Sequence, residues 1–178
     1  MGTKEHVGDG LKKLARLVPG IESYQDKEAL REGDKQLRQA LAERLDTAAK
    51  GLDRVVFQTQ QSGRLEHLAT LGRLEQRLHG TADAIRFASY GYSGLFSTVK
   101  VDEGRIRRLY DFDLALAEAV DTIQDHVQSL AATGPEEIGR ASFEPLDTGI
   151  SLLENQVRER TALFSSGLFS SDSALSKD

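Results

Sequence analysis

The chain has 178 residues, no cysteine, and a net charge of −5 from 28 acidic and 23 basic side chains. The lack of cysteine excludes disulfide bonds, thiolate catalysis and cysteine-ligated metal centres, and the acidic balance argues against a general nucleic-acid binder. We expect a cytoplasmic protein, with the inner face of the membrane as an alternative location, because the sequence has neither an apolar run of roughly 20 residues nor a secretory-signal pattern.

The first predicted element is a short basic amphipathic helix that ends at Pro19-Gly20. Leu11, Leu14 and Leu17 share one face of it, and two lysines and an arginine share the other. Such a helix suits a membrane surface or the groove of a partner protein. The alternative is that it packs over the end of the main fold with its lysines in solvent.

Four longer helices are predicted from apolar residues that recur at intervals of three and four. They cover about residues 26–60 and 64–90, then a segment from a cap at Asp102 to a stop at Thr133, and a segment from Ser142 to Ser165. Gly51 in the first of them marks a close helix contact or a bend, since glycine is costly inside a helix. Pro145 is expected in the first turn of the last helix, where proline is tolerated.

Short connections between four amphipathic helices predict an all-α fold, an antiparallel up-down-up-down four-helix bundle. We assign residues 1–20 to an N-terminal tail and the short amphipathic helix, and residues 21–165 to the bundle. Residues 166–178 are rich in serine, glycine and aspartate, and we expect a flexible tail there.

The connection Tyr90–Val101 is unusual for a solvent-exposed loop, because it has three aromatic residues, two glycines and no charge before Lys100. In the predicted topology it shares one end of the bundle with the start of the first helix and the end of the fourth. The other end, near Gln61 and Gly134, is plain and polar. We call the predicted gathering of rings at the first end the aromatic pole; it comprises Tyr24, Tyr90, Tyr92, Phe96, Tyr110 and Phe164.

The pentapeptide Ser-Gly-Leu-Phe-Ser occurs twice, at residues 93–97 and 166–170, and both copies fall at the aromatic pole. Two such tips beside a basic amphipathic helix favour shallow insertion into a membrane or a partner groove. The alternative is coincidence, with Phe96 folded into the core as an end plug. The predicted partner or membrane contacts are Leu11, Leu14, Leu17, Tyr92, Leu95, Phe96, Leu168 and Phe169.

Charged residues interrupt the apolar seams near the same end. Asp34 and Asp113 occupy seam positions on the first and third helices, Arg160 does so on the fourth, and Arg86 lies beside the seam of the second. We expect these four to form a polar core layer, because arginine and carboxylate pair well enough to survive partial burial. Three roles are open: a device that fixes helix register, a splayed and solvated region, or a ligand pocket.

No catalytic, cofactor or metal site is predicted. The Glu-x-x-His motifs of di-metal bundles are absent, the four histidines are scattered, and no glycine-rich phosphate loop follows a strand. Gly91 and Gly94 precede a helix start, where an anion could bind with help from Lys100 and Arg105.

Three segments resemble an uncharacterised group of small bacterial all-helical proteins: residues 17–21, residues 24–38 and Ala88–Phe96. The resemblance covers the first two-thirds of the chain, implies a bacterial helical protein of unassigned activity, and carries over no catalytic residue.

From all of these patterns we expect a non-enzymatic interaction or adaptor protein that docks on a protein partner through the aromatic pole, with peripheral contact to the inner membrane face as an option. The alternatives are a bundle that binds a small molecule or anion at the Asp/Arg layer, and a self-assembling structural protein, so a homo-oligomer is open. We expect neither a nucleic-acid partner nor a cofactor.

Overall fold

The structure is a computed structural model that describes the backbone of residues 27–88 and 103–165, and the side chains of residues 32–88, 109 and 111–162. The predictions for the N-terminal amphipathic helix, for the connection Tyr90–Val101 and for the C-terminal tail lie outside these residues. The side chains of the aromatic pole lie outside them as well.

The described residues are helical and contain no strand, so the all-α class is confirmed for them. The four long helices are α2 (Lys27–Gln61), α3 (Leu68–Arg86), α5 (Glu103–Ala132) and α6 (Arg140–Ser165), and a short 3-10 helix, η2 (Leu65–His67), leads into α3. The apolar periodicity therefore identified each long helix, and the differences are at their ends.

Three helix ends differ from the prediction. Helix α3 begins at Leu68, after the 3-10 helix η2, rather than near residue 64. Helix α3 ends at Arg86 rather than near residue 90. Helix α6 begins at Arg140, two residues before the predicted start, because the Ser142 hydroxyl accepts a hydrogen bond from the Gly139 backbone N–H at 3.1 Å. This contact resembles half of a capping box and places Ser142 inside the first turn rather than before it. The prediction that Pro145 lies in the first turn was accordingly wrong, because this proline is the sixth helical residue.

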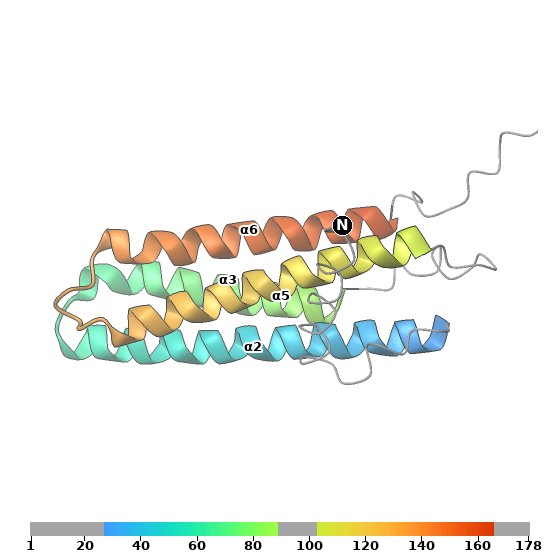
Figure 1. Ribbon diagram of the computed structural model, residues 1–178. Coiled ribbons are helices and arrows are strands. Elements are labelled where there is room, and N and C mark those ends of the chain that lie inside the picture. Colours follow the sequence, from blue (N-terminus) through green and yellow to red (C-terminus); the bar gives the residue numbers. More distant parts are fainter. Residues whose placement is uncertain (1–26, 89–102, 166–178) are drawn as a thin grey trace, which may run out of the picture.

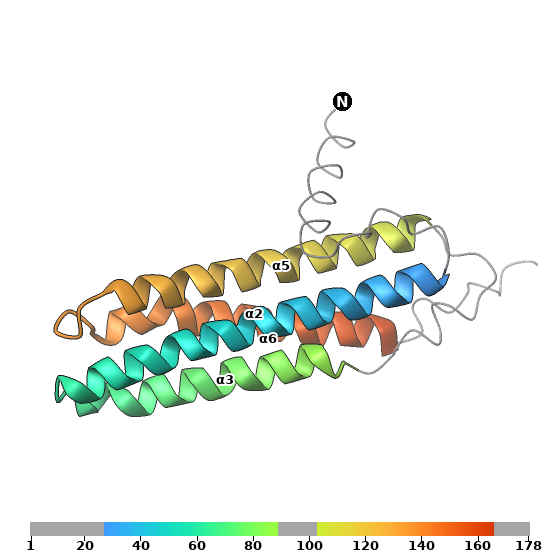
Figure 2. The ribbon, with the colours of Figure 1, turned by 90° about the horizontal axis from the view of Figure 1, so that it is seen from below.

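The four long helices lie side by side in both views (Figures 1 and 2). Helix α2 packs mainly against α3 and α5, and α6 packs mainly against the same two helices. Figure 1 shows the α2–α3 and α5–α6 connections at the same end of the molecule, and we call this the connection end. Helix α3 is the shortest of the four, with 19 residues against 35 in α2.

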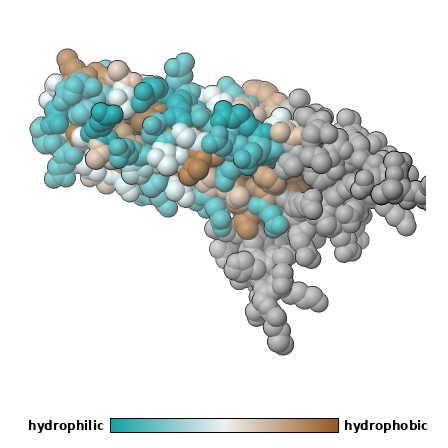
Figure 3. Space-filling view, turned by 90° about the horizontal axis from the view of Figure 1, so that it is seen from above, coloured by the Kyte–Doolittle hydropathy of each residue, from teal (hydrophilic) through white to brown (hydrophobic). Residues whose placement is uncertain are grey.

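Aliphatic side chains from all four helices fill the core, and leucines such as Leu41, Leu52 and Leu74 are fully buried. Gly51 lies where α2 and α5 approach closely: a Cβ atom there would lie 2.8 Å from Cγ1 of Val127. The expected close contact at Gly51 is thus confirmed. Among the helices that the structure describes, none is both long and apolar enough to cross a membrane, and Figure 3 shows a mainly hydrophilic face with scattered apolar side chains.

Candidate functional site: a buried aspartate–arginine cluster

Four charged side chains meet inside the bundle, away from the connection end. Asp34 and Arg38 come from α2, Asp113 from α5 and Arg160 from α6; we call them the Asp/Arg cluster. Arg160 donates from Nη2 to Asp34 Oδ1 at 2.5 Å and from Nε to Asp113 Oδ1 at 3.1 Å. Arg38 donates from Nε to the other oxygen of Asp34 at 2.8 Å. Asp34 is therefore the shared acceptor that joins the two arginines.

The cluster is buried and balanced in charge. The residues expose between 3% and 7% of their surface, and two carboxylates face two guanidinium groups. An isolated buried charge is strongly unfavourable, whereas a hydrogen-bonded pair is tolerated. The same argument implies that removing any one member leaves an uncompensated charge in the interior.

Arg38 extends the cluster to the remaining helix. Its Nη1 donates to the backbone carbonyl oxygens of Arg86 at 3.2 Å and Ala88 at 3.1 Å. The last carbonyls of a helix have no partner within the helix, and the helix dipole makes this end negative. Arg38 therefore caps α3 at its C-terminus, which explains why α3 stops earlier than its apolar pattern predicts.

Asp113 has a strongly perturbed acidity. Burial raises the pKa of this carboxyl to about 6, and the negative charge of Asp34 acts in the same direction, while Arg160 and Arg38 oppose the rise. Desolvation is the largest of these effects. A change in pH around 6 therefore changes the charge of Asp113 and, with it, the net charge of the cluster.

The predicted layer differs from the observed cluster at one position. Asp34, Asp113 and Arg160 come together, but the assignment of Arg86 to the layer was wrong. The Arg86 side chain pairs with Asp46 at 2.5 Å and with Asp83 at 2.5 Å on the half-exposed surface between α2 and α3. The reason is helical geometry, because Ile85 holds the buried position and the next residue points about 100° away from it.

Arg38 takes the place that was assigned to Arg86, and its role was missed. The signal was present in the sequence, since Arg38 follows Asp34 by four residues, the spacing at which an acid and an arginine meet on a helix. Arg38 is itself buried, with 7% of its surface exposed, on the same helix as the buried Asp34 and Leu41.

The predicted contact residues Leu11, Leu14, Leu17, Tyr92, Leu95, Phe96, Leu168 and Phe169 lie outside the described residues. The same holds for the glycines and Lys100 of the predicted anion site. In the part of the chain that is described, no group of three or more histidine or acidic side chains could hold a metal ion.

Comparison with known proteins finds no matching family model, no matching curated protein and no matching solved structure. Fold and site therefore define the class by themselves. Over residues 27–88 and 103–165, this is an all-α protein with four long helices and a buried Asp/Arg cluster toward one end.

Proposed function

We propose that the protein is a non-enzymatic interaction or adaptor protein. In this proposal the chain forms an antiparallel up-down-up-down bundle, which docks on a protein partner through the end that contains the Asp/Arg cluster. The observation that carries the proposal is the contact of Arg38 with the end of α3, because it fixes the point from which the segment containing Tyr92 and Phe96 departs.

The cluster supports docking through its rigidity. Three helices contribute side chains and the fourth contributes backbone carbonyls. The bonds from Arg160 join α6 to α2 and α5, and the bonds from Arg38 Nη1 join α2 to the end of α3. A binding surface that is held in place before the partner arrives loses less conformational entropy on association. A stiff end is therefore a favourable base for an interaction surface.

An exposed aromatic residue lies next to the cluster. Phe87 follows the last residue of α3 and is 72% exposed, and the Arg86 guanidinium carbon lies 5.8 Å from the centre of its ring. Aromatic residues and arginine are enriched among the residues that contribute most to protein–protein binding. Phe87 thus adds a described residue to the surface that the sequence predicts.

The arrangement of the cluster favours a structural role over a ligand pocket. The carboxylates of Asp34 and Asp113 accept hydrogen bonds from arginines inside the cluster, and the side chains expose at most 8% of their surface. A charged ligand would have to displace these bonds and pay for the desolvation again.

Affinity capture from native cells tests the proposal. We expect a partner to be retained by the wild type and lost by the variants Phe87→Ser and Tyr92→Ser/Phe96→Ser. Phe57→Ser is the matched control, because Phe57 is an exposed phenylalanine of α2 near the connection end, with 61% of its surface accessible. Retention by all variants, or equal loss in the control, would contradict docking at the cluster end.

A liposome assay separates a membrane from a protein partner. If the basic amphipathic helix contacts lipid, replacing Leu11, Leu14 and Leu17 by serine abolishes co-sedimentation with anionic vesicles and leaves protein capture intact. Unchanged co-sedimentation of that variant would remove the helix from the proposal.

A further inference from the structure

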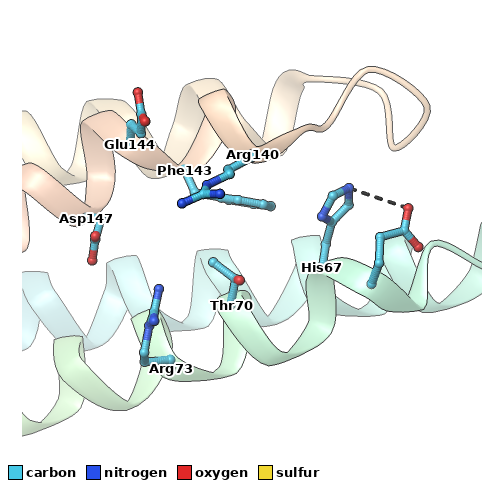
Figure 4. A pocket seen from close by; sticks show the side chains of 8 residues that line it. His67, Thr70, Arg73, Arg140, Phe143, Glu144 and Asp147 are labelled. Atoms are coloured by element: carbon cyan, nitrogen blue, oxygen red, sulfur yellow. Dashed lines mark ion pairs between the residues drawn. The ribbon is translucent and has the colours of Figure 1, made fainter.

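A cavity lies at the connection end, far along the bundle from the Asp/Arg cluster. It is a half-open cavity of about 500 Å³ between the first turns of α3 and α6 (Figure 4). This volume falls within the range of small-molecule sites. His67 and Thr70 line it from the α3 side, and Arg140 and Phe143 line it from the α6 side.

Two arginines in this cavity have no acidic partner. Arg73 of α3 and Arg140 of α6 both line it, and neither forms an ion pair with any residue that the structure describes. They differ in this from Arg77, one turn further along α3, which is bound by Asp147 and Glu154. Two guanidinium groups on opposite walls therefore keep their donors available.

His67 and Thr70 add polar atoms to the wall of the same cavity. His67 Nε2 is buried without a hydrogen-bond partner among the described residues. It points toward Glu66 rather than toward Arg73 and Arg140 (Figure 4), and its 3.7 Å distance to Glu66 Oε1 is too long for a hydrogen bond. The imidazole packs edge-on against Phe143 with 5.5 Å between ring centres. The Thr70 hydroxyl has no hydrogen bond to a described residue, whereas Thr81 on the same helix bonds to the Arg77 carbonyl. The Thr70 hydroxyl is therefore the neutral donor that is available beside the two arginines.

The acids of the cavity wall do not neutralise these donors. Glu66 pairs with Arg64 at 3.0 Å, and Asp147 pairs with Arg77. Figure 4 shows the Glu144 carboxylate pointing away from the other lining side chains. Helix α6 also begins at Arg140, so the positive end of its dipole lies at this cavity. Among the charged lining residues that have no ion pair with a described residue, Arg73 and Arg140 carry two positive charges and Glu144 carries one negative charge, so the unpaired balance is one positive charge.

We propose that this cavity binds a small ligand that carries a phosphate group. Arg73 and Arg140 hold the phosphate oxygens from the two walls, and the Thr70 hydroxyl donates to one of the remaining oxygens. A tetrahedral dianion can accept hydrogen bonds from several directions at once, and arginine is suited to bind its oxygens in pairs. The cavity is larger than a phosphate ion, so the rest of an ester has space beside it.

Titration of the full chain with inorganic phosphate, phenyl phosphate and acetate at constant ionic strength tests the proposal. We expect both phosphates to bind with a Kd in the range of ~1 mM or below, to shift the His67 ring signals in NMR spectra, and to leave the His126 signals unchanged. Tighter binding of phenyl phosphate than of inorganic phosphate would identify an ester as the ligand class, and equal binding would identify the free ion. Absence of binding, or equal binding of acetate, would overturn the proposal.

Variants locate the binding. Arg73→Ala/Arg140→Ala should weaken phosphate binding at least ~10-fold, because both charged donors are lost. The control Arg54→Ala/Arg158→Ala removes the same charge from exposed positions outside the cavity and should retain wild-type affinity. Thr70→Val keeps every charge and should weaken binding by a few fold. Equal loss in the control pair would reveal non-specific attraction and refute the site.

Discussion

Asp113→Asn should change how the stability of the protein depends on pH. The pKa of Asp113 is about 6 in the folded protein and has an ordinary value of 3.8, because burial penalises the charged form more than Arg160 favours it. A raised folded-state pKa contributes stability that is fully present below the ordinary value and is lost as the pH rises through about 6. At about 1.4 kcal/mol per pH unit, the difference between the folded and the ordinary pKa corresponds to roughly 3 kcal/mol of stability.

The comparison with asparagine isolates this one group. Every other acid titrates in both proteins, so the difference between their free energies of unfolding follows Asp113. We expect the wild type to gain up to roughly 3 kcal/mol over the variant between about pH 8 and about pH 4. Urea denaturation at a series of pH values measures the difference, and ¹³C NMR of the Asp113 carboxyl locates the midpoint directly.

The opposite sign would refute this reasoning. If the wild type lost stability relative to the variant on acidification, the attraction of Arg160 would outweigh desolvation in the cluster. A difference that is independent of pH would show that Asp113 does not titrate in this range. Asp111→Asn is the control, because it removes an exposed acid of the same helix that takes no part in the cluster.

Three other changes test individual contacts, each by urea denaturation. Arg38→Met leaves Asp34 with one arginine and removes the cap of α3, so we expect the free energy of unfolding to fall by about 3 kcal/mol or more. Amide exchange in the last turn of α3 should also become faster, and unchanged exchange there would contradict the capping role. Gly51→Ala gains about 1 kcal/mol of helix propensity but forces a Cβ against Val127, for a net loss of about 1–2 kcal/mol. Adding Val127→Ala should recover at least about 1 kcal/mol relative to additivity, and strict additivity would show that the two positions do not clash. Arg77→Met removes the bonds to Glu154 that join α3 to α6 and should cost about 1–2 kcal/mol, whereas an unchanged value would mean that solvent replaces them without loss.

The sequence predicted the helices well because their apolar spacing is regular and each seam has to face a core. It predicted the ends less well, because a helix end depends on which groups satisfy its free backbone atoms. Arg38 determines the end of α3, and Ser142 shapes the start of α6, and neither contact follows from periodicity. The local sequence pattern determines where the helices lie, whereas contacts between distant residues determine where they end.

The buried cluster was predictable in part. Asp34, Asp113 and Arg160 interrupt apolar seams, and a charge at such a position demands a partner from another seam. Arg86 was assigned wrongly because a residue beside a seam can turn either way, and the surface acids Asp46 and Asp83 attract it. The cavity at the connection end was not predicted at all, since it depends on how the first turns of two helices are spaced in the folded protein.

The contact of Arg38 with the end of α3 limits where a peptide can be inserted into the chain. Arg38 precedes Ala88 by 50 residues, yet its guanidinium donates a hydrogen bond to the Ala88 carbonyl oxygen. The backbone just after α3 is therefore held by a side chain of α2. A reporter or a recognition peptide inserted directly after Ala88 would keep the carbonyl oxygens of Arg86 and Ala88 hydrogen-bonded to Arg38. An insertion one turn earlier would separate these carbonyls from Arg38. The chain therefore offers an insertion position after Ala88 whose upstream limit is set by the hydrogen bond from Arg38.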